Sequence, residues 1–300
     1  MKQPRVCVFG EVLFDHFPDG KRVLGGAPFN VAWHLQAFGL APRFISRVGA
    51  DPDGDSVLAA MRGWGMDTQA VQIDAHRPTG RVSVKIADNE PAYDIVPDCA
   101  YDAIESRADL VPAGALLYHG TLATRAPVSR QTLDAITRET ASGTVFLDVN
   151  LRPPWWDRAD VRTRTRAADW VKLNADELAL LAPDHSDLAT QAGAFLAENN
   201  LKGLILTLGA EGAMAFMADG ERIMVKPGNS VRVVDTVGAG DAFSAVTILG
   251  IISGWPLALT LERAQRFASQ IVARRGATVG ERAFYEPLLK VWELSRSTDE

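Results

Sequence analysis

Residues 233–243 read Val-Val-Asp-Thr-Val-Gly-Ala-Gly-Asp-Ala-Phe, and a mostly apolar run follows them. The apolar residues at 242, 243, 246 and 249 recur at helical spacing, so a glycine-rich turn opens directly into a helix. The first N–H groups of a helix have no partners within it and carry the positive end of its dipole. Glycines let a phosphate approach such N–H groups closely. The stretch therefore fits an anion-binding helix N-terminus.

Asp241 lies in the first turn of this helix. The carboxylate can simply satisfy the helix dipole, or it can face the same space as a bound phosphate. Taken alone, Gly-x-Gly-Asp favours the first interpretation. The P-loop pattern Gly-x-x-x-x-Gly-Lys-Ser/Thr is absent from the sequence, and no Gly-x-Gly-x-x-Gly follows a strand-like segment. Local chemistry thus leaves the role of Asp241 open.

Short apolar segments alternate with helical patterns along the chain. The segments expected to be strands are 6–9, 43–48, 115–119, 145–149, 170–173 and 204–208, and expected helices include 30–38, 56–64 and 130–140. Such alternation indicates βαβ units and a mostly parallel, buried sheet. The prediction is an α/β fold in one domain covering residues 1–300.

Two segments depart from this pattern. Residues 12–24 are expected to form a hairpin around Pro18-Asp19-Gly20, and residues 81–98 contain a second hairpin around 87–91. We expect them to form a small antiparallel sheet that projects from the main domain. Such a sheet could serve as a lid or as a dimer contact, because exposed edge strands tend to be covered.

The composition excludes some classes of partner. The formal net charge of −6 gives no general electrostatic basis for binding nucleic acid. The longest apolar stretch is too short to cross a bilayer, and the first residues show no secretory h-region. The two cysteines, Cys7 and Cys99, fit a reducing compartment. We therefore expect a cytoplasmic protein without membrane or nucleic-acid partners.

Residues 235–243 resemble the C-terminal signature of the ribokinase-like, or PfkB, carbohydrate kinase family. The family's N-terminal signature is matched by Gly-Gly-Ala-Pro-Phe-Asn-Val-Ala at 25–32. The resemblance covers nearly the whole chain, including the projecting hairpins. It implies a three-layer α/β/α domain with a β lid, and an ATP-dependent kinase that phosphorylates a hydroxyl of a small sugar.

The same resemblance implies roles for individual residues near the acceptor sugar. Asp241 would remove the proton from the acceptor hydroxyl, and Gly238, Ala239 and Gly240 would form an anion hole for the transferring phosphate. This agrees with the physics of phosphoryl transfer, which needs positioning and charge stabilisation. The family's sugar-binding positions correspond to Asp15, Gly25, Gly26, Asn30 and Arg152.

On the nucleotide side, Asn174 and Glu177 are similar to the family's Asn-x-x-Glu motif, which organises Mg²⁺ through water. The two residues also have the form of a capping box, and Asn174 can do both. The resemblance makes Thr207, Gly209 and Gly212 part of the ATP wall, although a plain hairpin turn is the alternative. It also implies a monovalent cation, with K⁺ the candidate, near Asp235.

The identity of the sugar rests on two further segments. Asp-Val-Asn-Leu-Arg-Pro at 148–153 resembles fructokinases and 2-keto-3-deoxygluconate kinases. The sugar-acid kinases carry an arginine after a lid aromatic residue, whereas 93–98 here reads Tyr-Asp-Ile-Val-Pro-Asp. This favours a neutral sugar, with fructose converted to fructose 6-phosphate as the leading hypothesis. A 2-keto-3-deoxygluconate kinase, a ribokinase, a nucleoside kinase and a catalytically inactive sugar- or nucleotide-binding regulator remain alternatives, and a homodimer through the lid is expected.

Overall fold

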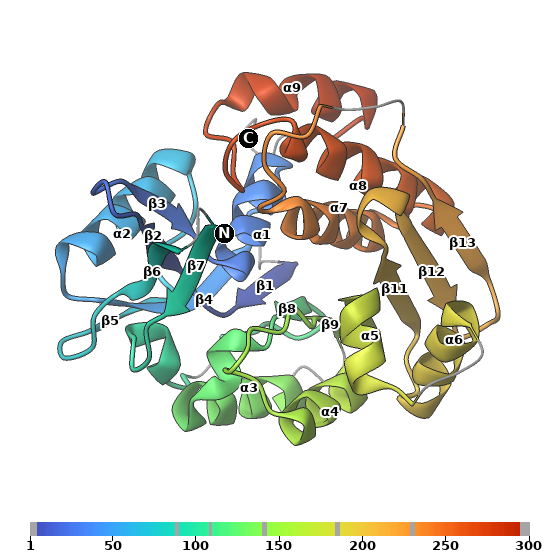
Figure 1. Ribbon diagram of the computed structural model, residues 1–300, viewed down its shortest axis with the longest axis horizontal. Helices are drawn as coiled ribbons and strands as arrows, with labels where there is room; N and C mark the ends of the chain where they lie inside the picture. The colour runs from blue at the N-terminus through green and yellow to red at the C-terminus, as the bar shows by residue number, and fades with distance from the viewer. Residues whose placement is uncertain are drawn as a thin grey trace.

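The computed structural model describes residues 5–87, 90–107, 110–139, 143–183, 187–228 and 232–294. It contains a nine-stranded sheet in the order β13-β12-β11-β10-β9-β8-β1-β4-β5 and a separate four-stranded sheet in the order β3-β2-β6-β7. Figure 1 shows the large sheet between two layers of helices, with the small sheet beside it. The expected α/β fold with a small second sheet is therefore confirmed.

The large sheet is parallel from β5 to β11 and ends in two antiparallel strands, β12 and β13. Its strands are β1 (Val6–Phe9), β4 (Arg43–Gly49), β5 (Val71–Asp74), β8 (Leu116–His119), β9 (Thr144–Asp148), β10 (Trp170–Asn174), β11 (Gly203–Thr207), β12 (Ala213–Met217) and β13 (Arg222–Val225). The six segments expected to be strands all lie in this sheet, with ends shifted by at most one residue.

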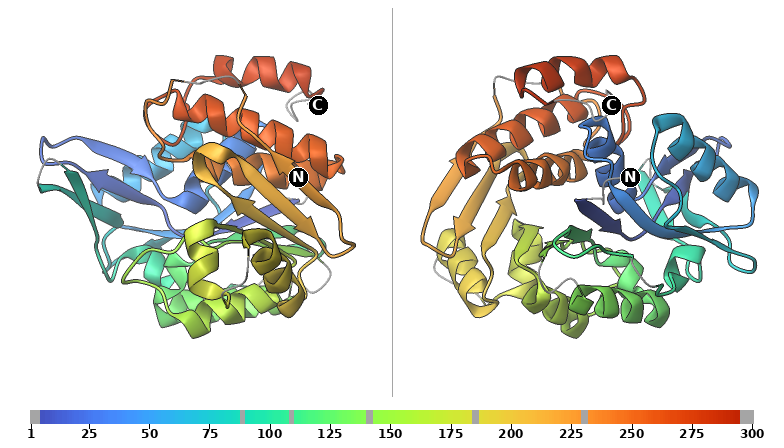
Figure 2. Two further views of the ribbon diagram at one scale, coloured as in Figure 1. Left: turned by 45° about the vertical axis from the view of Figure 1, so that its right-hand side comes forward. Right: turned by 180° about the vertical axis from the view of Figure 1, so that it is seen from behind.

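Helices cover both faces of the large sheet. They are α1 (Ala27–Ala37), α2 (Pro52–Trp64), α3 (Pro127–Glu139), α4 (Arg158–Ala167), α5 (Ala175–Leu181), α6 (Leu188–Glu198), α7 (Ala239–Ser253), α8 (Leu257–Val272) and α9 (Arg282–Val291). Figure 2 shows α7, α8 and α9 on one side and α3 to α6 on the other. Among the described residues, no helix is long and apolar enough to cross a membrane.

The three layers follow from alternation along the strands. In β1, Val6 and Val8 belong to the apolar cluster that includes α1, α7 and α8, whereas Cys7 and Phe9 belong to a cluster with Leu133 of α3. Successive side chains of a strand point to opposite faces, so both faces of this buried strand are apolar. Continuous hydrophobic strands therefore indicate helices on both sides.

Three helices begin earlier than the apolar pattern alone predicted, and the one expected over 30–38 is α1, which starts at Ala27. The helix expected over 56–64 starts at Pro52, and Asp51 caps it by accepting from the backbone N–H of Gly54 at 2.7 Å. Proline is well suited to a first helical turn, and aspartate to an N-cap. The helix expected over 130–140 starts at Pro127, and its last expected residue lies outside the described residues.

The small sheet consists of β2 (Leu13–His16), β3 (Arg22–Gly25), β6 (Gly80–Ala87) and β7 (Glu90–Ile95). Both expected hairpins are antiparallel, and a parallel pairing of β2 with β6 joins them. The first turn closes with Phe17 N–H donating to the carbonyl of Lys21 at 2.9 Å. The tip of the second turn lies outside the described residues. Figure 2 shows this sheet, which we call the lid, projecting from the body.

Candidate active site

The large sheet changes winding direction at β1. Strands β4 and β5 lie on one side of β1, and β8 to β11 lie on the other. In open α/β sheets, ligands bind beyond the carboxyl ends of the strands at such a switch point. Glu11 follows β1, Asp148 ends β9 and Asn174 ends β10, so all three reach this edge. The topology alone therefore locates the candidate site.

The N-terminus of α7 lies open at this edge. Its N-cap residue is Gly238, with φ 80° and ψ −2°, and no side chain caps the helix. A Cβ atom at position 238 would lie 2.4 Å from Cα of Ala277, so only glycine fits this left-handed turn without displacement. No side chain occupies this helix end, although the N–H of Ala239 donates to the carbonyl of Thr236 at 3.3 Å, and its positive dipole potential suits an anion.

Asp241 does not cap this helix. Its Oδ2 accepts a hydrogen bond of 2.7 Å from Nδ2 of Asn30, which is buried on α1. Burial raises the pKa of Asp241 to about 6, with Asp148 acting in the same direction, whereas the Asn30 hydrogen bond and the charges of Lys172 and Arg152 oppose the rise. A carboxylate with this pKa is ionised at neutral pH and is a stronger base than an ordinary aspartate.

A buried polar cluster lies behind Asp241. Nζ of Lys172 contacts both carboxylate oxygens of Asp148, at 2.9 and 2.8 Å. Ser244 Oγ donates to the same carboxylate at 2.7 Å, and the Tyr118 hydroxyl donates to it at 3.2 Å. All four side chains are buried. The cluster therefore ties β8, β9 and β10 to the first turns of α7.

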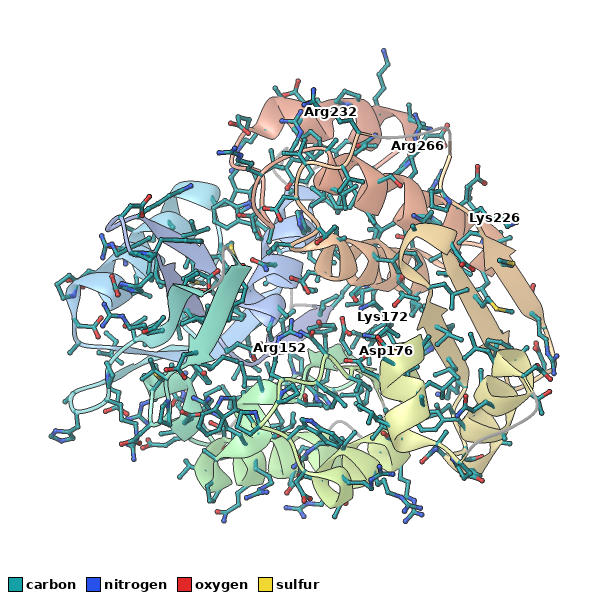
Figure 3. All side chains as sticks on the ribbon, viewed as in Figure 1. Arg152, Lys172, Asp176, Lys226, Arg232 and Arg266 are labelled. Atoms are coloured by element: carbon teal, nitrogen blue, oxygen red, sulfur yellow. The ribbon has the colours of Figure 1, made fainter. Side chains whose placement is uncertain are left out.

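Two further carboxyl groups border the acceptor side. Glu11 is 3% exposed, and its Oε2 has no hydrogen-bond partner among the described residues. Burial raises the pKa of Glu11 to about 7, and that of Asp15 on the lid to about 6. Arg152, beyond β9, is exposed, and its charge acts on both Glu11 and Asp241. Figure 3 shows Arg152 and Lys172 near the centre of the molecule.

The two glycines before Asn30 bring backbone segments together. Gly25 ends β3, and Gly26 is the N-cap of α1 with φ 108°. A Cβ atom on Gly26 would lie 2.7 Å from the carbonyl oxygen of Glu11. The absence of a side chain therefore lets the start of α1 pack directly against the segment that carries Glu11.

A cleft of about 890 Å³ extends from this edge. Of the residues expected on the nucleotide side, Asn174, Thr207, Gly209, Gly212, Ala239 and Gly240 all line it. Its walls also include apolar side chains of β13, α7 and α8, namely Met224, Phe243, Ala268 and Val272. One cleft therefore brings together most of the predicted nucleotide-side residues.

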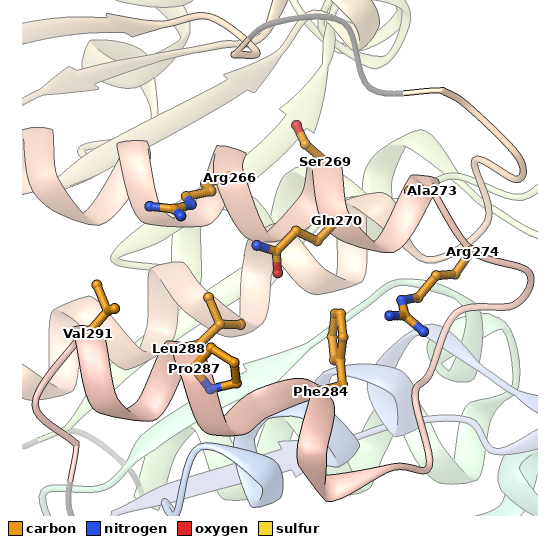
Figure 4. Close-up of a pocket in the computed structure, with 9 residues that line it drawn as sticks. All are labelled: Arg266, Ser269, Gln270, Ala273, Arg274, Phe284, Pro287, Leu288 and Val291. Carbon is orange, nitrogen blue, oxygen red and sulfur yellow. The ribbon is translucent and has the colours of Figure 1, made fainter.

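A second depression, of about 410 Å³, lies between α8 and α9. Figure 4 shows its lining, with Arg266 and Arg274 around the apolar side chains of Phe284 and Leu288. Ser269 borders both spaces. Because the larger cleft reaches the N-terminus of α7 and the end of β10, it is the candidate site.

Asn174 and Glu177 form a full capping box at the start of α5. Asn174 Oδ1 accepts from the backbone N–H of Glu177 at 2.8 Å, and Glu177 Oε2 accepts from that of Asn174 at 2.9 Å. Glu177 Oε1 also accepts from the Leu151 N–H at 2.7 Å. Burial raises the pKa of Glu177. Each carboxylate oxygen retains one further acceptor position, which suits contact with metal-bound water.

Asp235 lies in the segment that leads to Gly238. Its Oδ1 accepts from the N–H of Val237, and its Oδ2 accepts from the N–H of Gly276, both at 3.0 Å. The carboxylate thus joins this segment to the loop after α8. Its expected role beside a monovalent cation stays a prediction.

Sequence reasoning missed Lys172, Ser244, Tyr118 and Glu11 as parts of the site. Lys172 carried a signal, because it is a single charge inside the apolar strand 170–173. Ser244 lies three residues after Asp241 and therefore faces the same side of the helix. The contributions of Tyr118 and Glu11 depend on which strands are neighbours in the sheet, which their local sequence does not reveal.

A three-layer α/β/α fold with a separate small β-sheet, an uncapped helix N-terminus and a buried carboxylate of raised pKa is typical of ribokinase-like kinases. Residues 5–283 match the model of the pfkB family of carbohydrate kinases, and the chain belongs to that family. It is 32% identical to a fructokinase of Klebsiella pneumoniae over 263 residues, which cover 82% of this chain and 84% of the relative.

Two solved structures share the fold. A fructokinase double mutant from Vibrio cholerae O395, with fructose, ADP and potassium ion bound, superposes with a TM-score of 0.80 at 24% identity, covering 95% of this chain and 98% of the other. An aminoimidazole riboside kinase from Salmonella enterica, with aminoimidazole riboside and an ATP analogue, gives 0.79 at 25% identity, covering 92% and 95%. The likeness to the first structure shows the fold alone.

Proposed function

We propose that this sugar kinase transfers the γ-phosphate of ATP to a hydroxyl of fructose, giving fructose 6-phosphate, with Asp241 as the general base. The observation that carries the proposal is the position of Asp241, which Asn30 holds on the uncapped first turn of α7, directly after two residues that line the large cleft, Ala239 and Gly240. A base and an anion-binding turn on one helix are the two elements that phosphoryl transfer to a hydroxyl requires.

In the proposed reaction, the acceptor oxygen forms a bond to the γ-phosphorus while the bond from that phosphorus to the β,γ-bridging oxygen breaks. The hydroxyl proton passes to Asp241, and ADP leaves with the electron pair. The N–H groups of Gly238, Ala239 and Gly240 would bind the charge on the phosphoryl oxygens. Thr207, Gly209 and Gly212 would border the phosphates and ribose, and the apolar wall at Ala268 and Val272 would suit an adenine ring.

The chain's own residues also fit a magnesium ion held through water. Among the described residues, no group of three or more His, Cys, Asp or Glu side chains could hold a metal by itself. Asn174 lines the cleft, and Glu177 behind it keeps free acceptor positions. This resembles the Mg²⁺ sites in which one carboxylate, waters and substrate phosphates complete the coordination. The ion would supply positive charge between the phosphates.

The charges at the acceptor side support a neutral substrate. Glu11, Asp15 and Asp241 contribute three carboxyl groups with raised pKa values. Arg125, the other nearby arginine, is already paired with Asp102 at 2.7 Å. Of the two described arginines whose charge acts on Glu11, Arg152 would then remain for a substrate carboxylate, whereas carboxyl groups and Asn30 suit hydroxyl groups.

An ADP-coupled assay with fructose, 2-keto-3-deoxygluconate, ribose and aminoimidazole riboside would test the substrate. The riboside is included because the fold neighbour at 25% identity binds it. We expect the highest kcat/KM with fructose. Efficient turnover of 2-keto-3-deoxygluconate without turnover of fructose would overturn the proposal, and phosphorylation of the riboside alone would make the protein a nucleoside kinase.

A further inference from the structure

The ion pair of Lys172 with Asp148 lies directly behind the proposed phosphate turn. A Cβ atom built on Gly240 would lie 3.4 Å from Nζ of Lys172, so the ammonium group faces this glycine. Gly240 itself lines the large cleft. Lys172 is 5% exposed and keeps Nζ in place through its two contacts with Asp148. A fixed positive charge therefore lies next to the place where phosphate would bind.

The helix that carries the turn also holds the counter-ion. Ser244 Oγ lies 2.7 Å from Asp148 and 3.0 Å from the carbonyl oxygen of Gly240, one helical turn earlier. The Asp148 carboxylate is thus shared between the lysine of β10 and the first turns of α7. This arrangement fixes the position of the ammonium relative to Gly240 and Asp241.

A purely structural explanation of this pair is weak. A buried ion pair loses the hydration of both charges, and apolar residues of similar size often stabilise a protein equally well. Both neighbouring residues of β10, Val171 and Leu173, are buried and apolar. A lysine in this strand therefore needs a reason beyond stability.

We propose that Lys172 is a catalytic cation of the kinase, which contacts the transferring phosphoryl group from behind Gly240 while Asp148 and Ser244 hold it in place. The inference rests on the proposed function. Phosphoryl transfer places charge on three equatorial oxygens, and a preorganised cation in a water-poor site stabilises that charge strongly. With one ammonium hydrogen free of Asp148, the lysine can donate to a phosphoryl oxygen.

The titration of Asp241 reports whether the charge of Lys172 acts on the base, and the change in kcat at an unchanged KM reports whether it acts on the transferring phosphoryl group. The charged or titratable groups that act on Asp241 are Glu11 after β1, Tyr118 on β8, Asp148 on β9, Arg152 beyond β9 and Lys172 on β10. Of these, Lys172 and, to a smaller extent, Arg152 lower the pKa of Asp241. Loss of its charge should therefore raise that pKa and move the acidic limb of the rate profile to higher pH.

The test compares Lys172→Gln, Lys172→Arg and Tyr118→Phe in the full chain. The glutamine can still donate to Asp148 but lacks the charge, the arginine keeps the charge, and the phenylalanine removes a neutral donor from the same carboxylate. We expect Lys172→Gln to lower kcat by about 10²-fold, as loss of one transition-state donor does, with little change in the KM for sugar. Its acidic limb should move to higher pH, while the other two variants keep the wild-type limb.

Two results would overturn the inference. One is a Lys172→Gln enzyme whose kcat falls no further than that of Tyr118→Phe, whether or not its acidic limb moves. If Lys172→Gln does not fold, the double variant Lys172→Met with Asp148→Asn removes both charges together. Wild-type turnover by that variant would equally exclude a catalytic role. A wild-type protein that phosphorylates no sugar would instead refute the proposed function, so the two failures are distinguishable.

Discussion

The N-termini of α5 and α7 differ in how the first backbone N–H groups, which have no partner within the helix, are satisfied. Asn174 and Glu177 close α5 with reciprocal hydrogen bonds between side chains and backbone N–H groups. Gly238 leaves α7 without a side-chain cap, and Asp241 turns to Asn30 instead. The two ends border the same cleft through Asn174 and Gly240. An uncapped helix end that borders a cleft is informative, because a bound anion could stabilise its N–H groups.

The largest effect is expected when the proposed base, Asp241, is replaced at the uncapped N-terminus of α7. Asp241→Asn keeps the size of the side chain and an oxygen that can accept from Asn30, but it cannot take up the hydroxyl proton. We expect kcat to fall by about 10³-fold or more, since base catalysis and charge balance at the phosphate are both altered. Steady-state assays with the preferred sugar would measure the loss, and calorimetry would show whether ATP still binds.

A variant that turns over at the wild-type rate would show that Asp241 is only a first-turn acid. Unchanged ATP binding matters because it separates loss of chemistry from loss of the fold.

The second test adds a side chain at Gly238, where the uncapped N-terminus of α7 packs closely against Ala277. Gly238→Ala introduces a Cβ atom 2.4 Å from Cα of Ala277 at φ 80°. We expect loss of about 1–3 kcal/mol of stability and a kcat at least about tenfold lower, because the N–H groups of the turn move. Thermal unfolding and kinetics would be measured on the same preparation.

Gly254 provides a matched control at the other end of α7. It also has a left-handed backbone, with φ 68°, but an added Cβ atom would meet nothing within 4 Å. Gly254→Ala should therefore cost about 1 kcal/mol from backbone strain alone and leave kcat unchanged. Equal kinetic losses in both variants would show that the turn at 238 has no special role.

The smallest effect is expected from a change at the capped N-terminus of α5. Asn174→Ala removes the cap of α5 and should cost about 1 kcal/mol of stability. The proposed water-mediated contact with Mg²⁺ also predicts that this variant needs a higher Mg²⁺ concentration for half-maximal rate. Asp187→Ala removes the corresponding cap of α6, where the side chain accepts from Thr190 N–H at 2.9 Å.

The two cap variants should lose similar stability, and only Asn174→Ala should change the Mg²⁺ dependence. If neither variant changes it, the Asn174–Glu177 pair is a capping box and nothing more.

The fold could be predicted because its signals are local. Apolar strands, the turn at Pro18-Asp19-Gly20 and the glycine turn before 241 each follow from short stretches of sequence. The residues that the family resemblance assigned to ATP, Thr207, Gly209 and Gly212, line one cleft, and their role in binding the nucleotide stays a prediction. The sequence could not decide between two roles for Asn174 and Glu177, because this pair can form either a helix cap or a metal site. Their hydrogen bonds in the structure show the cap.

The cluster around Asp148 could not be predicted, for a physical reason. Its members come from β8, β9, β10 and α7, and they meet only because the sheet places these strands side by side. Its local signals were Lys172, a single charge in an apolar strand, and Ser244, which follows Asp241 by three residues. Burial and neighbouring charges also set the pKa values of Glu11 and Asp241, which depend on distances that sequence does not give.

The parallel pairing at the centre of the lid has a consequence for how the chain folds. Leu13 pairs with Gly80 and His16 with Ser83, and α1, β4, α2 and β5 all lie between these partners in the sequence. Closing so long a loop is slow, because its entropic cost precedes any gain from the contact. The body closes longer loops still, because β1 pairs with β8 and Asn30 contacts Asp241, so we expect the lid to assemble before the N-terminus of α7 joins α1.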